Sequence, residues 1–167
     1  MKTYLKISLI FSLTYFLTGC GAKQTSETVA QTLVQYYQSN QFQEAFQLFL
    51  PQSEAYQVAE VIGKSKSFLK ANGVGGEAEY REHIADVLKA KRNSLKIPWK
   101  QVKFEKLTIK TTKKHLESLE MLEGLLLLKG KVMFQQPVKL VKFKGRLYLW
   151  EVGKLDRHRG KSRSKII

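Results

Sequence analysis

Between residues 26 and 98, apolar side chains recur every three or four positions, which is the period of an amphipathic helix. Val29, Leu33 and Tyr37 fall on one stripe of the first such segment, and Thr25 or Ser26 can cap its start. The pattern predicts helices over residues 26–38, 42–49, 54–71 and 77–95. These segments make the first half of the chain helical.

After Pro98 the period changes from about 3.6 to 2, which is typical of half-buried strands. One slip in the alternation near its start indicates a β-bulge. Lys144-Gly145 has the form of a two-residue hairpin turn. The segment 113–123 fits either a strand or a helix, and we expect a strand there. The other expected strands cover residues 102–110, 125–134, 138–143 and 147–152.

Helices followed by antiparallel strands predict an α+β fold, with the N-terminal helices packed on one face of a curved sheet. The short segment Asn40-Gln41-Phe42-Gln43-Glu44-Ala45 and the closing strands over residues 137–150 resemble the nuclear-transport-factor-2-like family, whose fold is a cone. The resemblance covers most of residues 26–152 and implies a cone-like domain. The helix over residues 77–95 and the segment 113–123 depart from the simple cone pattern.

The N-terminus has the features of a secretory signal peptide. Lys2 and Lys6 precede an apolar stretch over residues 7–17 that is too short to span a bilayer as a helix. It ends in Leu17-Thr18-Gly19-Cys20, which resembles the lipobox of bacterial lipoproteins. The resemblance implies cleavage between Gly19 and Cys20 and acylation of Cys20, the single cysteine of the chain. The alternative is a buried N-terminal helix with a free thiol.

These features divide the chain into four segments and predict where the protein is located in the cell. We expect a signal peptide over residues 1–19, a lipidated tether over 20–25, the cone-like domain over 26–153 and a basic flexible tail over 154–167. Acyl chains on Cys20 would hold the protein at a membrane surface of the cell envelope. By resemblance to lipoproteins that lack aspartate after the cysteine, this would be the outer membrane if the cell is Gram-negative, and the plasma membrane if it is Gram-positive.

The charge of the chain is strongly positive and unevenly distributed. The sequence has 29 Lys and Arg against 14 Asp and Glu, a net charge of +15, and residues 100–167 carry most of the excess. This balance favours an anionic partner, such as lipid headgroups, an acidic cell-wall polymer or an envelope protein, and export excludes most nucleic acid. The alternative is a solvated face whose lysines protect strand edges. The residues expected to contact an anionic surface are Lys139, Lys142, Lys144, Arg146, Arg157, Arg159, Lys161, Arg163 and Lys165.

Catalytic and metal-binding patterns are weak. Glu79, His83 and Asp86 share one helical face, but exposed helices commonly show such runs, so we expect no metal site and no cofactor. No nucleophile stands in a recognisable constellation, and we expect no catalytic residue. The function predicted is therefore a non-enzymatic binding or interaction module. The alternatives are a carrier of a small apolar ligand in the cone cavity and, third, an envelope enzyme.

Overall fold

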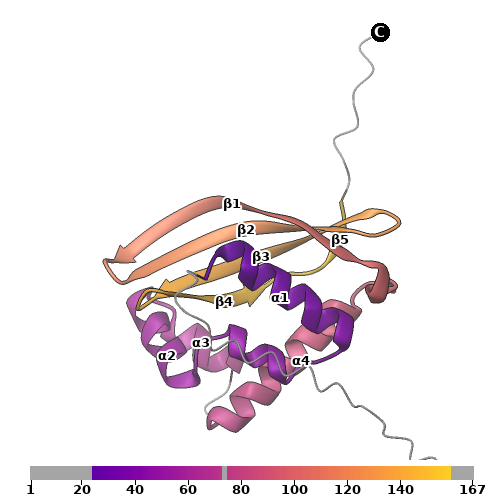
Figure 1. Cartoon of the computed structure of the whole chain (residues 1–167). Coiled ribbons are helices and arrows are strands. Elements are labelled where there is room, and N and C mark those ends of the chain that lie inside the picture. The colour runs from indigo at the N-terminus through magenta and orange to yellow at the C-terminus, as the bar shows by residue number, and fades with distance from the viewer. Residues whose placement is uncertain (1–23, 73–74, 159–167) are drawn as a thin grey trace, which may run out of the picture.

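The computed structural model describes residues 24–72 and 75–158 and shows helices followed by a curved, unclosed antiparallel sheet (Figure 1). The α+β fold class is thereby confirmed. The helices are α1 (Ser26–Ser39), the 3-10 turn η1 (Glu44–Leu48), α2 (Gln52–Val61), α3 (Ser65–Asn72), α4 (Glu77–Asn93) and the 3-10 turn η2 (Trp99–Gln101). The strands are β1 (Lys103–Leu116), β2 (Leu119–Lys129), β3 (Met133–Phe143), β4 (Arg146–Val152) and β5 (Asp156–Arg157).

Local sequence explains both ends of α1. The Thr25 hydroxyl accepts a hydrogen bond from the backbone N–H of Thr28 at 3.1 Å, so the expected N-terminal cap is confirmed. At the other end Asn40 adopts a left-handed conformation with φ 59°, and its N–H bonds to the carbonyl of Tyr36. Asparagine tolerates this conformation better than most residues, which is why the helix stops where the sequence predicts.

The helix expected over residues 54–71 is wrong as a single element, because Gly63 divides it into α2 and α3. Gly63 has φ 69°, a conformation that glycine adopts at little cost. The N–H of Lys64 bonds to the carbonyl of Ala59 at 2.7 Å, which closes the end of α2. The short helix expected over residues 42–49 is the 3-10 turn η1, while α4 matches the helix expected over 77–95 to within two residues.

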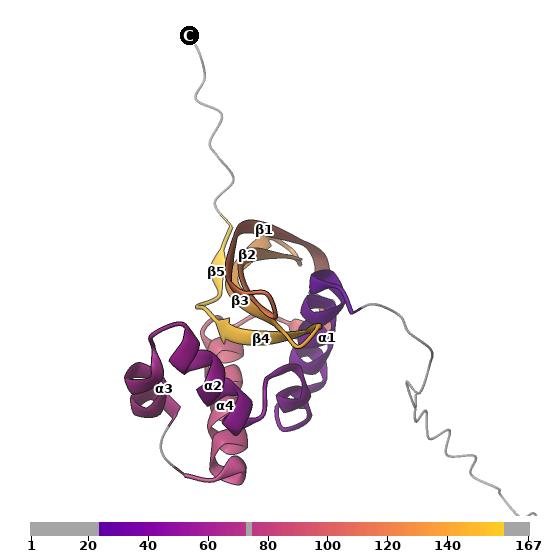
Figure 2. The ribbon, with the colours of Figure 1, turned by 90° about the vertical axis from the view of Figure 1, so that its left-hand side faces the viewer.

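The sheet is a meander in the order β1-β2-β3-β4, and β5 pairs with β3 beyond the end of β4. It curls strongly, with α1 at the open side of the curl and α2, α3 and α4 grouped beside β4 (Figure 2). β1 pairs only with β2, so it forms an edge of the sheet. Leu155 is fully buried just before β5, and the folded domain therefore extends beyond residue 153.

The strand expected over residues 125–134 is wrong, because the chain reverses direction at Gly130 between β2 and β3. The N–H of Gly130 bonds to the carbonyl of Val132 at 3.1 Å in this turn. The segment 113–123 is extended rather than helical, as expected, but it is not one strand, because a turn at residues 117–118 divides it into the end of β1 and the start of β2. The expected slip is also confirmed, since the β1–β2 register shifts between Phe104 and Lys106.

Side chains from α1 pack into the concave side of the curl. Leu33 and Tyr37 are fully buried, and the Gln136 amide on β3 reaches the Tyr37 hydroxyl at 3.5 Å. A second contact region joins the other helices to β4, where the rings of Phe68 and Trp150 stack with their centroids 5.8 Å apart. The sheet is thus held from both sides, and its β1 edge remains at the surface.

Candidate functional site: a cationic edge strand

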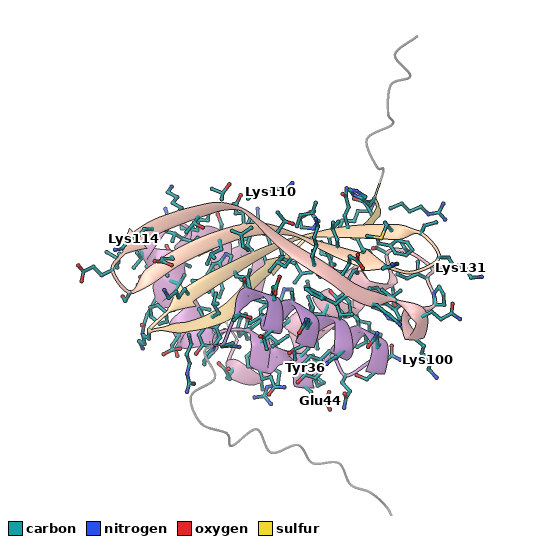
Figure 3. The ribbon with its side chains drawn as sticks, turned by 45° about the horizontal axis from the view of Figure 1, so that its top comes forward. Tyr36, Glu44, Lys100, Lys110, Lys114 and Lys131 are labelled. Carbon is teal, nitrogen blue, oxygen red and sulfur yellow. The ribbon has the colours of Figure 1, made fainter. Side chains whose placement is uncertain are left out.

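Five lysines make β1 the most cationic strand of the sheet. All five are exposed, and they are spread along the whole strand. Figure 3 shows Lys110 and Lys114 projecting outward from β1, with Lys100 and Lys131 near its other end. We call the five residues the β1 lysines: Lys103, Lys106, Lys110, Lys113 and Lys114.

The β1 lysines lack carboxylate partners. Among the residues that the structure describes, none of their ammonium groups lies within 4.0 Å of an Asp or Glu oxygen. Glu105 is the one acidic residue on the strand itself, and it is also exposed without an ion pair in the described chain. No direct ion pair within the described chain therefore neutralises these lysines.

Three other lysines expected to contact an anionic surface lie on β3 and the β3–β4 hairpin. They differ from the β1 lysines because each has a carboxylate partner. The ammonium of Lys139 lies 2.6 Å from a Glu151 oxygen, and that of Lys142 lies 3.6 Å from Glu120. Lys144 contacts Glu54 at the start of α2 at 2.8 Å. These pairs neutralise much of the charge that the sequence predicts to be available there.

The other predicted contact residues divide into two groups. Arg146 on β4 and Arg157 on β5 are exposed and have no ion pair within the described part of the chain. These two arginines lie apart from the β1 lysines in the sheet, because β2 and β3 separate their strands from β1. Outside the described residues lie Cys20, Arg159, Lys161, Arg163 and Lys165.

Irregular pairing limits what the β1 edge can bind. The register with β2 shifts at three places, between Phe104 and Lys106, between Ile109 and Thr111, and between Lys114 and Leu116. Bulges and lysines on an edge strand oppose pairing with another strand. The β1 lysines and the register shifts therefore disfavour the addition of an extended peptide to this edge of the sheet.

A cleft of about 720 Å³ lies where η1, α2 and α4 meet the β3–β4 hairpin. It brings Lys144 and Arg146 together with Arg81, which the sequence analysis did not single out because it lies far from them along the chain. Glutamates balance these cations: Glu54 pairs with Lys144, and Glu77 accepts a hydrogen bond from the Gln52 N–H at 2.8 Å. The cleft has mixed charge, whereas β1 carries five lysines and a single glutamate.

Burial shifts the pKa of three side chains that pack in or beside the core. Burial raises the pKa of the Tyr37 hydroxyl far above its ordinary value, and the hydrogen bond with Gln136 opposes this weakly. Burial likewise raises the pKa of Tyr80, with a further contribution from Glu77. Desolvation lowers the pKa of Arg92, whose Nε donates to the Tyr37 carbonyl at 3.4 Å. These groups stabilise the packing around α1 and α4.

Within the described ranges, no three His, Cys, Asp or Glu side chains are grouped so that they could hold a metal ion, and Glu79, His83 and Asp86 form no such group. No helix in the same ranges is both long and apolar enough to cross a bilayer.

Comparison with known proteins gives no relative for this chain. No family model, no curated protein and no solved structure matches it.

Proposed function

We propose that this protein is a lipoprotein of the bacterial cell envelope whose nuclear-transport-factor-2-like, cone-shaped domain is a non-enzymatic binding module for an anionic surface. In this proposal Cys20 carries the acyl anchor, and cleavage after Gly19 produces the mature N-terminus. The lipobox and the preceding apolar stretch support the anchor. The curved sheet and its N-terminal helices are compatible with the cone.

The short tether supports a domain held close to the bilayer. Five residues separate Cys20 from the start of α1 at Ser26, and the six steps between them span at most about 3.5 Å each in an extended chain, or roughly 20 Å in total. α1 packs along β1, and near its end the Gln38 amide donates to the Val102 carbonyl just before β1 at 2.6 Å. The anchor therefore keeps the cationic edge within reach of the membrane surface.

The observation that carries the proposal is the set of five exposed β1 lysines without carboxylate partners in the described chain. A lysine near an anionic membrane contributes about 1 kcal/mol of attraction, and this attraction decays over a Debye length of about 8 Å at physiological salt. Several such lysines along one edge give a useful affinity without a pocket. Phosphate groups of lipids or of envelope polymers are the matching chemistry.

The test compares two variants that lose the same charge at different places. One replaces Lys106, Lys110, Lys113 and Lys114 with glutamine. The other makes the same change at the paired lysines, which are Lys139, Lys142, Lys144 and Lys154. The full chain in neutral detergent is applied to immobilised polyphosphate and eluted with salt. We expect the β1 variant to elute at clearly lower salt than the control variant, whereas equal elution would contradict a specific role for β1.

A further inference from the structure

A groove of about 370 Å³ lies between α3, α4 and the end of β4, on elements that the cationic edge does not use. Its floor is apolar. Ile84 and Leu88 from α4 are buried there, and Trp150 and Val152 contribute from β4. The volume is within the range of small-molecule pockets, about 300–1,000 Å³, and too small to accommodate a folded protein partner.

Aromatic contacts hold the groove in shape. Phe68 on α3 stacks on Trp150 with an interplanar angle of 26°, and its centroid lies 5.9 Å from that of Tyr80 on α4. These contacts fix the short helix α3 against β4 and α4. Because the walls are already positioned, a ligand that enters pays little for ordering the protein.

The rim of the groove is cationic. Lys64 lies at the start of α3 and Lys91 near the end of α4, and neither forms an ion pair within the described residues. His83 also lines the groove. The single acidic residue of the lining, Glu151, already pairs with Lys139 at 2.6 Å. An apolar floor beneath unneutralised cations therefore matches a ligand with an apolar body and an anionic head.

We propose that this groove binds a single-chain amphiphile with an anionic head, its acyl chain lying against Phe68, Ile84 and Trp150 and its head between Lys64 and Lys91. A free fatty acid and a lysophospholipid share this chemistry. The site lies outside the packed concave side of the sheet. It goes beyond the proposed binding of β1 to an anionic surface and depends on none of the β1 lysines.

Trp150 supplies the signal for a test. The chain has two tryptophans, and the other, Trp99, is only 2% exposed and does not line the groove. The full chain in phosphatidylcholine nanodiscs is titrated with dodecanoate, dodecyl phosphate or dodecyltrimethylammonium while tryptophan emission is recorded. We expect saturable changes with the two anionic probes. Tighter binding of dodecanoate would assign a fatty acid, and tighter binding of dodecyl phosphate a lysophospholipid. Equal binding of the cationic probe would overturn the proposal.

Variants separate the groove from the bilayer around it. Val87→Phe fills the groove at a half-buried position without changing charge, and we expect it to abolish the saturable signal. Lys64→Gln combined with Lys91→Gln should weaken binding of the anionic probes by about tenfold. The matched control replaces the exposed Lys66 and Lys89, which do not line the groove, and should bind like the wild type. An unchanged signal in Val87→Phe would place the binding elsewhere and overturn the proposal.

Discussion

Lys139 and Glu151 face each other across β3 and β4, with the lysine Nζ and the glutamate Oε2 2.6 Å apart. The neighbouring strand pair repeats the arrangement, since Lys142 on β3 lies opposite Glu120 on β2. Such pairs contribute little to stability at the surface, about 0–1 kcal/mol each, but they cancel charge locally. The middle of the sheet is therefore close to neutral, while the β1 edge keeps its positive charge. This difference is the basis of the proposed function.

The anchor gives the first prediction. Replacing Cys20 with serine removes the thiol to which a diacylglyceryl group would be attached, so the chain should no longer incorporate lipid. The measurement is metabolic labelling with an alkyne-bearing fatty acid in a bacterial host, followed by mass analysis of the N-terminus. Wild type should carry label and begin at Cys20. Label retained in the Cys20→Ser protein would show that the lipid is attached to another residue and would contradict Cys20 as the anchor.

The β3–β4 turn gives the second prediction. Lys144 and Gly145 have φ 49° and 80°, so the two-residue turn expected from the sequence is confirmed. Nothing lies within 4 Å of a side chain added at Gly145, so Gly145→Ala strains only the backbone. We expect the free energy of unfolding in urea to fall by about 1–2 kcal/mol. The control Gly76→Ala, at a position with negative φ and equal space, should change it by less than about 0.5 kcal/mol.

The third prediction concerns Trp99, which joins three elements. Its indole N–H donates to the Arg92 carbonyl at 3.2 Å, and its ring lies edge-on to Tyr37 with the centroids 4.9 Å apart. Trp99→Ala should lower the free energy of unfolding by about 3–5 kcal/mol, because it leaves a cavity where η2 packs against α1 and α4. The exposed neighbour Lys100 is the control, and Lys100→Ala should leave stability within about 0.5 kcal/mol of wild type. A small effect of Trp99→Ala in urea melts would show that the indole is not part of a tightly packed core.

The fourth prediction is a pH dependence. Since burial raises the pKa of Tyr37 in the folded state, the folded chain holds this proton more tightly than the unfolded chain. The stabilisation is fully present below the unfolded pKa of about 10 and is lost as pH rises above it. Relative to Tyr37→Phe, wild type should lose about 1 kcal/mol of unfolding free energy between pH of about 10 and 11. The comparison cancels the titration of lysines common to both proteins. If the unfolding free energies of wild type and Tyr37→Phe changed in parallel with pH, the pKa of Tyr37 would be the same in the folded and unfolded states.

Elements defined by local signals were predictable from the sequence. Thr25 and Asn40 mark the ends of α1, and Gly145 marks the last hairpin turn. The β1–β2 turn was harder, because Glu117-Ser118 contains no glycine, proline or asparagine. Leucines on both faces of β2 also remove the alternation that would locate the strand, since Leu127 is half-buried while Leu126 and Leu128 are fully buried.

The overall positive charge was the one property of the candidate site that the sequence predicted. The sequence places an excess of lysines after residue 100, but whether a lysine is paired depends on contacts between distant segments. Glu54 lies 90 positions before Lys144 and still forms its ion pair, through the packing of α2 beneath the β3–β4 hairpin. No pattern along the chain indicates this contact. The unpaired lysines of β1 therefore became visible only in the folded structure.

The most direct test of the central claim is lysine reactivity in the anchored protein. The full lipidated chain is placed in vesicles of phosphatidylcholine alone or with phosphatidylglycerol, and each lysine's rate of acetylation is measured by mass spectrometry. If the β1 edge faces an anionic surface, Lys106, Lys110 and Lys113 should be protected only in the anionic vesicles, and added salt should remove the protection. The exposed Lys66 and Lys89 should react equally in both. Equal reactivity of the β1 lysines in the two kinds of vesicle would contradict the proposed function.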